Sequence, residues 1–448
     1  MHPALLVPRL TGFDREVVGA LAASGPSTQA KLLVRLRGVS QATLSRAMKR
    51  LADQGIVEKG GATRDAMFRL SPAAEHFARP PHLRPVARYD RARIDGYEPN
   101  KTRWLPREAE DRMRQAAGRV AHQLDASTYS RRIAERFLID LSWASSHLEG
   151  NTYKYLEAEA LIKYAETAEG HDWTEATMIL NHKRAIGLLL EAVDTRGITP
   201  EWTARLHSLL MRDLVPAEAL GRVRSRGDEY GIGGSSYRPS SDPVRLAEDQ
   251  GALCWAAERV ENPFEASFLL MAGTAYLQAF HDGNKRTGRL ACNLPLLRAG
   301  LPPMSFMAVT PSEYITGAIA FYELGDPAPL ADVLSRAYAE AAPHYSAAVA
   351  TQRAPRSAEI RHRGRINAAI AALMEEAVAG RPREVAAYAA EALADLPEQD
   401  RGILEANIAA ALAAIGPHNH DAWEADRRLV EAFAEWRASD PPADAVRP

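Results

Sequence analysis

The chain has 448 residues, and its 55 basic and 57 acidic side chains leave a formal net charge of −2, so no global field attracts it to nucleic acid or membranes. A hydrophobic content of 46% and a charged content of 25% exclude a largely disordered chain, and the length favours two or three domains. Two cysteines, Cys254 and Cys292, exclude a disulfide scaffold and a Cys-rich zinc ribbon.

Residues 1–78 are predicted to form a winged helix-turn-helix, an α+β domain of three short helices and a two-stranded wing. Apolar residues recur at helical spacing from Phe13, a second helix follows Gly25, and Ser40 is the expected N-cap of the third. Residues 56–71 have the composition of two strands joined by a Gly-Gly turn.

A third helix of this kind places its first residues in the major groove and its basic residues near phosphates. The predicted DNA-binding residues are Gln41, Thr43, Ser45, Arg46, Lys49 and Arg50, with wing residues Lys59, Arg64 and Arg69 extending the basic face. The pattern resembles bacterial winged-helix transcriptional regulators. Winged helices also serve in protein contacts or dimerisation, and the residues leave that role open.

The rest of the chain is expected to be mainly α-helical, in three parts. Residues 79–107, rich in Pro and Arg, indicate an extended linker, and residues 108–345 indicate an all-helical core interrupted by a glycine-rich β-hairpin flap at 221–243. Residues 356–440 predict a small alanine-rich helical domain, whose default role is packing or formation of a homodimer. The start of the chain has no signal-peptide pattern and no apolar run of about 18 residues occurs, so we expect a cytoplasmic protein without a membrane span.

The most informative segment is QAFHDGNKRTGRLACNLPLL, residues 278–297, in which an apolar helix leads into a polar turn that opens another helix. Such a turn offers free backbone N–H groups and the positive end of a helix dipole to a phosphate. Asp282 is the candidate Mg²⁺ ligand. The predicted nucleotide-binding residues are Gly283, Asn284, Lys285, Arg286, Gly288 and Arg289.

This segment resembles the Fic-family motif, in which a His is followed two residues later by Phe, then by Asp or Glu, Gly, Asn, Gly or Lys, and Arg, with a second Arg three residues on. The matching residues are Phe280, Asp282, Gly283, Asn284, Arg286 and Arg289. Three further stretches are similar to the family's inhibitory motif, flap and closing helices: SSHLEGNTY (145–153), IGGSSYRP (232–239) and FYELGDPAPLADVL (321–334). The resemblance covers about half of the chain.

The resemblance implies a helical core that binds ATP or a related nucleotide and transfers its AMP to a hydroxyl of a target protein. The implied catalytic residues are Gln278, Asp282, Asn284 and Arg286, with Gln278 at the position of the family's histidine. Glutamine has no accessible protonation state for general-base catalysis, which typically contributes about 10²- to 10⁴-fold. His281 is either a substitute base or a partly exposed residue at a helix end. Lys285 stands where AMP-transferring members carry glycine and some phosphate-transferring members carry lysine, so the phosphoryl group that would be attacked is open.

The resemblance also implies inhibitory residues Ser145, Glu149 and Gly150, with the Glu149 carboxylate paired with Arg289 so that it excludes the γ-phosphate. A purely structural ion pair is the alternative. The implied flap residues are Ile232, Gly233, Gly234, Ser235 and Tyr237, which would hold an extended protein target through main-chain hydrogen bonds. Tyr237 either packs over the site or anchors the hairpin.

Three functions fit these residues. The first is a nucleotide-binding Fic-type AMP transferase with altered or impaired chemistry, coupled to a DNA-binding winged helix. The second is a non-catalytic transcriptional regulator that senses a nucleotide, which Gln278 favours. The third is a transferase that acts on a non-protein substrate.

Overall fold

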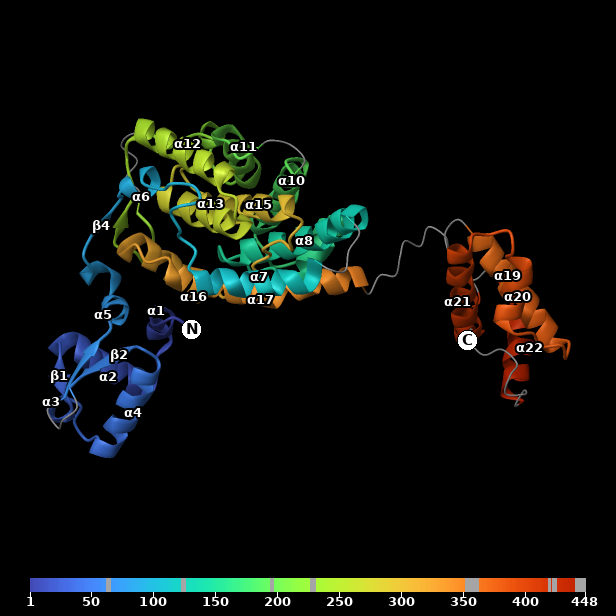
Figure 1. Cartoon of the computed structure of the whole chain (residues 1–448), viewed down its shortest axis with the longest axis horizontal. Helices are drawn as coiled ribbons and strands as arrows, with labels where there is room; N and C mark the ends of the chain where they lie inside the picture. The colour runs from blue at the N-terminus through green and yellow to red at the C-terminus, as the bar shows by residue number, and fades with distance from the viewer. Residues whose placement is uncertain are drawn as a thin grey trace. The chain divides into compact units, whose positions relative to one another are not determined.

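The computed structural model describes residues 1–61, 66–121, 126–193, 197–225, 231–350, 362–417, 420 and 425–439. The described chain is mainly helical and divides into two compact units, Met1–Val349 and Ala350–Pro448 (Figure 1). Among the helices of these ranges, none is long and apolar enough to cross a membrane.

The first 78 residues form an N-terminal module of helices around a small antiparallel sheet with strand order β1-β3-β2. The third large helix begins where expected, because the Ser40 hydroxyl accepts the Thr43 N–H at 3.1 Å. The elements are α1 (Pro3–Leu6), η1 (Val7–Arg9), α2 (Gly12–Ser24), β1 (Ser27–Thr28), α3 (Gln29–Arg35), α4 (Gln41–Asp53), β2 (Val57–Gly60), β3 (Met67–Leu70) and α5 (Pro72–Ala78). Leu44, Leu51 and Phe68 lie in a core that also takes in Ile319 and Ala320 of the following helical core, so the module packs against that core.

The segment 79–107 is not the free linker that its composition suggested. It contains η2 (Pro81–Leu83), β4 (Ala87–Arg88) and α6 (Ala92–Asp95). Tyr97 and Trp104 are buried in the main core. The Glu265 carboxylate accepts hydrogen bonds from the Tyr97 hydroxyl and from the backbone N–H of Trp104. The aromatic side chains among the Pro and Arg residues account for the difference, because their burial holds the segment to the core.

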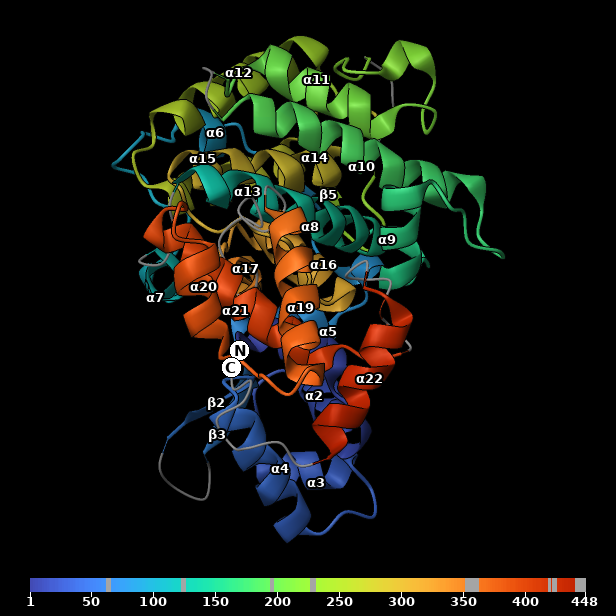
Figure 2. The same cartoon turned by 90° about the vertical axis from the view of Figure 1, so that its right-hand side faces the viewer.

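The helical core surrounds α13, whose residues from Phe264 to Leu277 are all buried. A helix that is apolar on every side must be enclosed, and α13 lies between α12 and α17 in both views (Figures 1 and 2). The core elements are α7 (Arg107–Ala121), α8 (Ala126–His147), α9 (Tyr155–Tyr164), α10 (Trp173–Glu191), α11 (Pro200–Met211), η3 (Ala217–Ala219), α12 (Pro243–Arg259), α13 (Pro263–Leu277), α14 (Asn284–Ala291), α15 (Asn293–Arg298), α16 (Pro311–Ile319), the π-helical turn η4 (Ala320–Leu324) and α17 (Ala328–Ala350).

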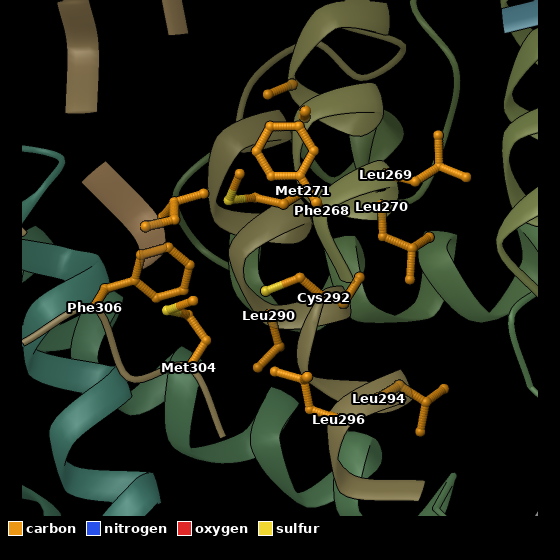
Figure 3. Packing of buried hydrophobic residues seen from close by; sticks show 14 of the residues in the cluster. Phe268, Leu269, Leu270, Met271, Leu290, Cys292, Leu294, Leu296, Met304 and Phe306 are labelled. Carbon is orange, nitrogen blue, oxygen red and sulfur yellow. The ribbon is translucent and has the colours of Figure 1, made fainter. Parts of the chain in front are cut away.

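The packing around α13 places α14 against it closely. Figure 3 shows Phe268 and Met271 on one side of α13 and Leu269 and Leu270 on another. At Gly288 of α14, an added Cβ would lie 2.9 Å from the Met271 carbonyl oxygen, so only glycine allows the two backbones to approach this far. This close contact fixes the turn between the two helices, where the motif residues lie.

The flap differs from the expected β-hairpin. In its described part, the strand β5 (Tyr237–Arg238) pairs in parallel with β4, with Tyr237 opposite Ala87. Residues 226–230 of the predicted flap lie outside the described residues. The partner strand of β5 is therefore β4, in the segment after the N-terminal module, whereas the prediction placed a partner strand within the flap. Sequence periodicity does not reveal a pairing between segments 150 residues apart.

The second unit is a separate helical bundle with a core of its own. Its described helices are α19 (Arg363–Val378), α20 (Val385–Ala392), α21 (Glu398–Ala414) and α22 (Arg427–Ala438), all within the predicted range 356–440. Ile370, Leu404, Ile408 and Phe433 are almost completely buried against one another.

Candidate functional site

The motif turn begins where α13 ends. Gln278 adopts the left-handed conformation (φ 50°), which stops the helix, and Gly283 (φ 73°) precedes the first residue of α14. An added Cβ at Gly283 would lie 2.4 Å from the Met211 sulfur, so both the backbone angle and the close neighbour require glycine. A non-glycine residue at positive φ is uncommon and strained, and such residues are concentrated at functional sites.

Asn284 holds this turn together rather than facing outward. Its Oδ1 accepts the Phe280 N–H at 2.9 Å, and its Nδ2 donates to the Phe280 carbonyl at 2.8 Å and to the Gln278 side-chain oxygen at 3.1 Å. The residue is 2% exposed. Because both protons of its side-chain amide are used inside the turn, the Asn284 side chain has no proton left for a phosphate in this conformation, whereas its backbone N–H at the start of α14 can still donate.

The side chain of Gln278 is fixed at both ends. Its Nε2 donates to the Ala275 carbonyl at 2.7 Å, its Oε1 accepts from Asn284, and its backbone carbonyl accepts from Arg224 Nε at 2.7 Å. The remaining lone pair of Oε1 can orient a hydroxyl but cannot take up its proton at neutral pH.

Two histidines lie beside the motif turn, and they differ in burial. His281, the substitute considered from the sequence, is exposed. His207 of α11 stacks on Phe280 with ring centroids 4.1 Å apart, donates from Nε2 to the Asp282 carbonyl at 2.9 Å, and accepts the Gly221 N–H on Nδ1 at 2.9 Å. Burial lowers the pKa of His207 to about 4, so the ring is neutral near pH 7 and both nitrogens are engaged. His207 therefore holds the motif turn, a role that no pattern in its own segment indicated.

Arg286 carries the clearest sign of an anion site. Its guanidinium is 4% exposed, and Nη2 donates to Asp282 Oδ2 at 2.8 Å. Its Nε and Nη1 are buried, and the described residues provide no acceptor for either. Buried donors are almost always satisfied, so two orphaned donors at the start of α14 can take oxygen atoms from a ligand or from water.

Asp282 is the only predicted metal ligand, and its side chain is 56% exposed while paired with Arg286. No group of three or more His, Cys, Asp or Glu residues that could hold a metal occurs in the described chain. The Asp282 carboxylate does not form a metal site by itself. It can bind Mg²⁺ when phosphate oxygens supply further ligands.

The predicted contact between Glu149 and Arg289 is confirmed. Glu149 Oε1 lies 2.8 Å from Arg289 Nη2, and Oε2 lies 3.2 Å from Lys285 Nζ. Burial tends to raise the pKa of Glu149, but the positive charges of Arg289, Lys285 and Arg286 prevail and lower it to about 2. Glu149 is therefore ionised and forms ion pairs with Lys285 and Arg289, two of the residues that were predicted to bind a nucleotide.

Ser145 and His182 hold Arg289 in this pose. Arg289 is completely buried and donates from Nε to the Ser145 hydroxyl and from Nη2 to the Ser145 carbonyl, both at 2.9 Å. His182 Nδ1 donates to the Met178 carbonyl at 2.8 Å, so its Nε2 accepts the Ser145 hydroxyl at 2.9 Å. Gly150 (φ 94°) directly follows Glu149. Ser145 thus links α8 to the motif arginine, and no sequence pattern had indicated the part that His182 takes in this contact.

This geometry agrees with the comparison to known proteins. The sequence model of the Fic/DOC family matches residues 197–296. The chain contains a Fic/DOC domain. It is 23% identical over 211 residues to protein adenylyltransferase fic-1 of Caenorhabditis elegans, covering 46% of this chain and 40% of that protein. It is 28% identical over 172 residues to protein adenylyltransferase Fic of Nematostella vectensis, covering 36% of this chain and 38% of the relative. The chain thus spans about two fifths of the length of the curated relatives that it matches.

Solved structures are similar at lower identity. C. elegans Fic-1 (residues 134–508) is 18% identical with a TM-score of 0.44, covering 54% of this chain and 71% of that structure. A Fic family protein from Desulfovibrio desulfuricans G20 is 22% identical with a TM-score of 0.45, covering 60% of this chain and 82% of that structure.

In the Fic/DOC domain described here, Tyr237 anchors the flap. Its side chain is completely buried, its hydroxyl donates to the Tyr276 carbonyl at 2.8 Å, and the two rings stack with centroids 5.1 Å apart. These contacts agree with the alternative in which Tyr237 anchors the flap. Of the other predicted flap residues, Ile232 is half-buried, Gly233 and Gly234 are exposed, and Ser235 is buried.

The predicted DNA-binding residues lie on or near one face of α4. Gln41, Arg46, Lys49 and Arg50 are exposed, and Thr43 and Ser45 are half-buried. Arg50 is paired with Asp14 at 2.6 Å, and in the wing Arg69 is paired with Glu58 at 2.7 Å, whereas Lys59 is exposed. Arg64 lies outside the described residues. The basic face is thus partly neutralised by neighbouring carboxylates.

Proposed function

We propose that this Fic/DOC-domain protein binds ATP or a related nucleotide at the start of α14 as a nucleotidyl (AMP) transferase homologue with altered chemistry. The observation that carries the proposal is the pair of buried, unpartnered donors on Arg286. Lys285 and Arg289 lie next to Arg286 and already bind an anionic group, the carboxylate of Glu149. The curated relatives that match this region are named adenylyltransferases.

In this proposal the phosphate oxygens satisfy Arg286 and the backbone N–H groups at the start of α14, and Asp282 together with phosphate oxygens holds Mg²⁺. In the proposed AMP transfer, the oxygen of a target hydroxyl attacks the α-phosphorus of ATP and forms a bond to AMP, while the phosphoanhydride bond breaks and pyrophosphate leaves. Gln278 Oε1 orients that hydroxyl and leaves the proton to solvent. We therefore expect transfer to be about 10²- to 10⁴-fold slower than with a histidine at this position.

Glu149 opposes this binding in the proposed scheme. A carboxylate that neutralises Arg289 and Lys285 competes with a phosphate for the same donors, and its ionised state keeps the competition in force at neutral pH. The nucleotide binds only when Glu149 withdraws.

The test is calorimetric titration of ATP with Mg²⁺ into the parent protein and Glu149→Gly. We expect the variant to bind at least about tenfold more tightly, because Arg289 and Lys285 become available to phosphate. Glu166→Gly, which removes an exposed glutamate from the loop after α9, is the matched control and should bind as the parent does. Equal affinities for Glu149→Gly and the parent would contradict the inhibitory role.

The N-terminal module is, in the same proposal, a winged helix that binds DNA through α4 and the wing. Support comes from the exposed Gln41, Arg46 and Lys49 on one helix face of an otherwise nearly neutral chain. The alternative function, a non-catalytic regulator that senses a nucleotide, is favoured by one observation: the Gln278 amide is already bound within the motif turn.

A further inference from the structure

Glu323 lies in the π-helical turn η4 and collects donors from three separate parts of the chain. Its side chain has no exposed area. The donors are the Ser235 hydroxyl and the Ser236 N–H from the flap, His76 from α5 of the N-terminal module, and Arg84 from the segment between the module and the core. A single-turn π-helix is rare and is frequently found at functional sites.

On the flap side, Glu323 acts on the backbone directly. The Ser235 hydroxyl and the Ser236 N–H both donate to Oε1, each at 2.6 Å. The next residue, Tyr237, is held by the carbonyl of Tyr276, which precedes Gln278 by two residues. The carboxylate therefore determines where the flap begins its path along the motif turn.

On the module side, the same carboxylate is bound through its other oxygen. His76 Nε2 donates to Oε2, and Arg84 Nη1 lies 3.5 Å from it. His76 is flanked in α5 by Ala74 and Phe77, which belong to the core of the N-terminal module, as does Ala320 of η4. A displacement of α5 would thus act on the carboxylate that holds the flap.

A buried carboxylate makes such coupling strong. Burial tends to raise the pKa of Glu323, but hydrogen bonds from His76, Ser235 and Ser236 and the charge of Arg84 lower it below its usual value. An ionised group in this position depends on all its donors, because losing some of them leaves a buried charge without compensation. If His76 withdraws, the carboxylate must move toward other donors or water, and the flap hydrogen bonds change with it.

We propose that Glu323 is the positioning residue of the flap, and that the N-terminal module acts on the flap through the contact between His76 and Glu323. DNA bound by the module then changes how the flap receives an extended protein target. The inference rests on the proposed function for the roles of DNA and the flap, whereas the coupling itself depends only on the contacts described above.

The experiment is hydrogen exchange, measured by mass spectrometry on peptides covering residues 231–238 of the full chain. His76→Ala should speed exchange of these amides by roughly tenfold or more. Losing the His76 hydrogen bond to Oε2 lets the Glu323 carboxylate shift, which weakens the hydrogen bonds that Oε1 accepts from Ser235 and Ser236. Glu323→Ala and Ser235→Ala should speed exchange of the same amides, because each removes the hydrogen bond between Ser235 and Glu323. Ser235→Ala provides the test if Glu323→Ala does not fold.

Two controls separate coupling from loosening of the fold. His82→Ala removes an exposed histidine close to His76 in the chain and should leave flap exchange unchanged. Glu313→Gln weakens an ion pair, 2.6 Å long, between Glu313 and Arg9 of the same module. Glu313 lies on α16, the helix directly before η4, and among the described residues it makes no hydrogen bond to the flap. If Glu313→Gln speeds flap exchange as much as His76→Ala, general docking of the module is responsible and the inference is wrong.

A second arm adds mixed-sequence duplex DNA. We expect DNA to change flap exchange in the parent, and we expect His76→Ala to bind the same DNA without that change, an outcome that a purely structural role would not produce. If the parent does not bind DNA, the proposed DNA role fails while the His76→Ala result still tests the coupling. If DNA binds and flap exchange is the same in parent and His76→Ala under all conditions, the coupling is overturned.

Discussion

Gln278 is held in the motif turn by its neighbours, at the position where the resemblance to the Fic family implies a histidine. The hydrogen bonds from Gln278 to the Ala275 carbonyl and from Asn284 to Gln278 use groups that a histidine ring does not match one for one. Arg286, with its two orphaned donors, makes no hydrogen bond to the Gln278 side chain among the described residues.

The double variant Gln278→His/Glu149→Gly should therefore regain transfer, because it supplies the base and removes the carboxylate that competes with phosphate. Incubation with ATP and Mg²⁺ followed by intact-mass measurement should show an added adenylyl or phosphoryl group, and the mass identifies the bond that is cut. Gln278→Asn/Glu149→Gly provides the control without a base. Nucleotide binding without any modification of the double variant would favour the nucleotide-sensing alternative.

Glu149 should also produce a defined pH dependence of stability. Its pKa is about 2 in the folded protein against an ordinary value of 4.5, so its ionised form favours folding. That contribution is fully present above about pH 4.5 and is lost as the pH falls toward about 2. Glu149→Gln lacks it and leaves the buried Arg289 without a counterion, which should lower the free energy of unfolding by roughly 3 kcal/mol near neutral pH.

Urea titrations of the parent and Glu149→Gln should show this difference shrinking between about pH 5 and about pH 2. Phosphate or ATP should narrow the difference at neutral pH, since an added anion pairs with Arg289 in the variant. A difference that is the same at every pH would mean that the pair with Arg289 does not govern the ionisation of Glu149.

At the scale of elements, the exposed face of α4 determines the behaviour expected of the N-terminal module. Arg46 and Lys49 are exposed, whereas Arg50 is paired with Asp14 and must leave that partner to reach a phosphate. In the proposed complex with DNA, the number of phosphates that α4 neutralises would thus depend on the ion pair between Arg50 and Asp14.

Replacing Arg46, Lys49 and Arg50 together by alanine should weaken binding to duplex DNA and reduce the steepness of its salt dependence by about two to three contacts, nearer two if Arg50 stays with Asp14. Fluorescence anisotropy over a range of salt concentrations measures both quantities. Alanine at the exposed Arg205, Arg245 and Arg428 removes equal charge outside the module and serves as the control. If the first triple variant binds DNA as the parent does, α4 does not contact DNA and the module has another partner.

At the scale of the whole molecule, the two units have separate hydrophobic cores. Among the described residues, the core of the second unit consists of residues from Ile366 onward, and the cores of the first unit consist of residues up to Tyr345. Each unit thus has the contacts that it needs for its own stability.

A chain that ends at residue 355 should therefore bind nucleotide as the full chain does, and its thermal unfolding should keep the transition of the first unit. Calorimetric scans of both chains are the direct measurement, with one transition of the full chain absent from the shortened one. A shortened chain that loses nucleotide binding while still folded would assign the C-terminal unit a part in the site.

The sequence by itself determined those features that depend on neighbouring residues: the N-cap at Ser40, the helices of both units, and the glycine turn between α13 and α14. The resemblance to a family motif added the pairing of Glu149 with Arg289. Tertiary structure alone decided the burial of Tyr97 and Trp104, the pairing of β4 with β5, and the roles of His182, His207 and Glu323. These features join segments at least 37 residues apart, as in the bonds from the Ser145 hydroxyl to His182 and from the Leu105 backbone N–H to the Glu265 carboxylate, which are 37 and 160 residues apart. A local pattern records which side chains are apolar or charged, whereas the partner of a buried polar group is chosen only when distant segments pack together.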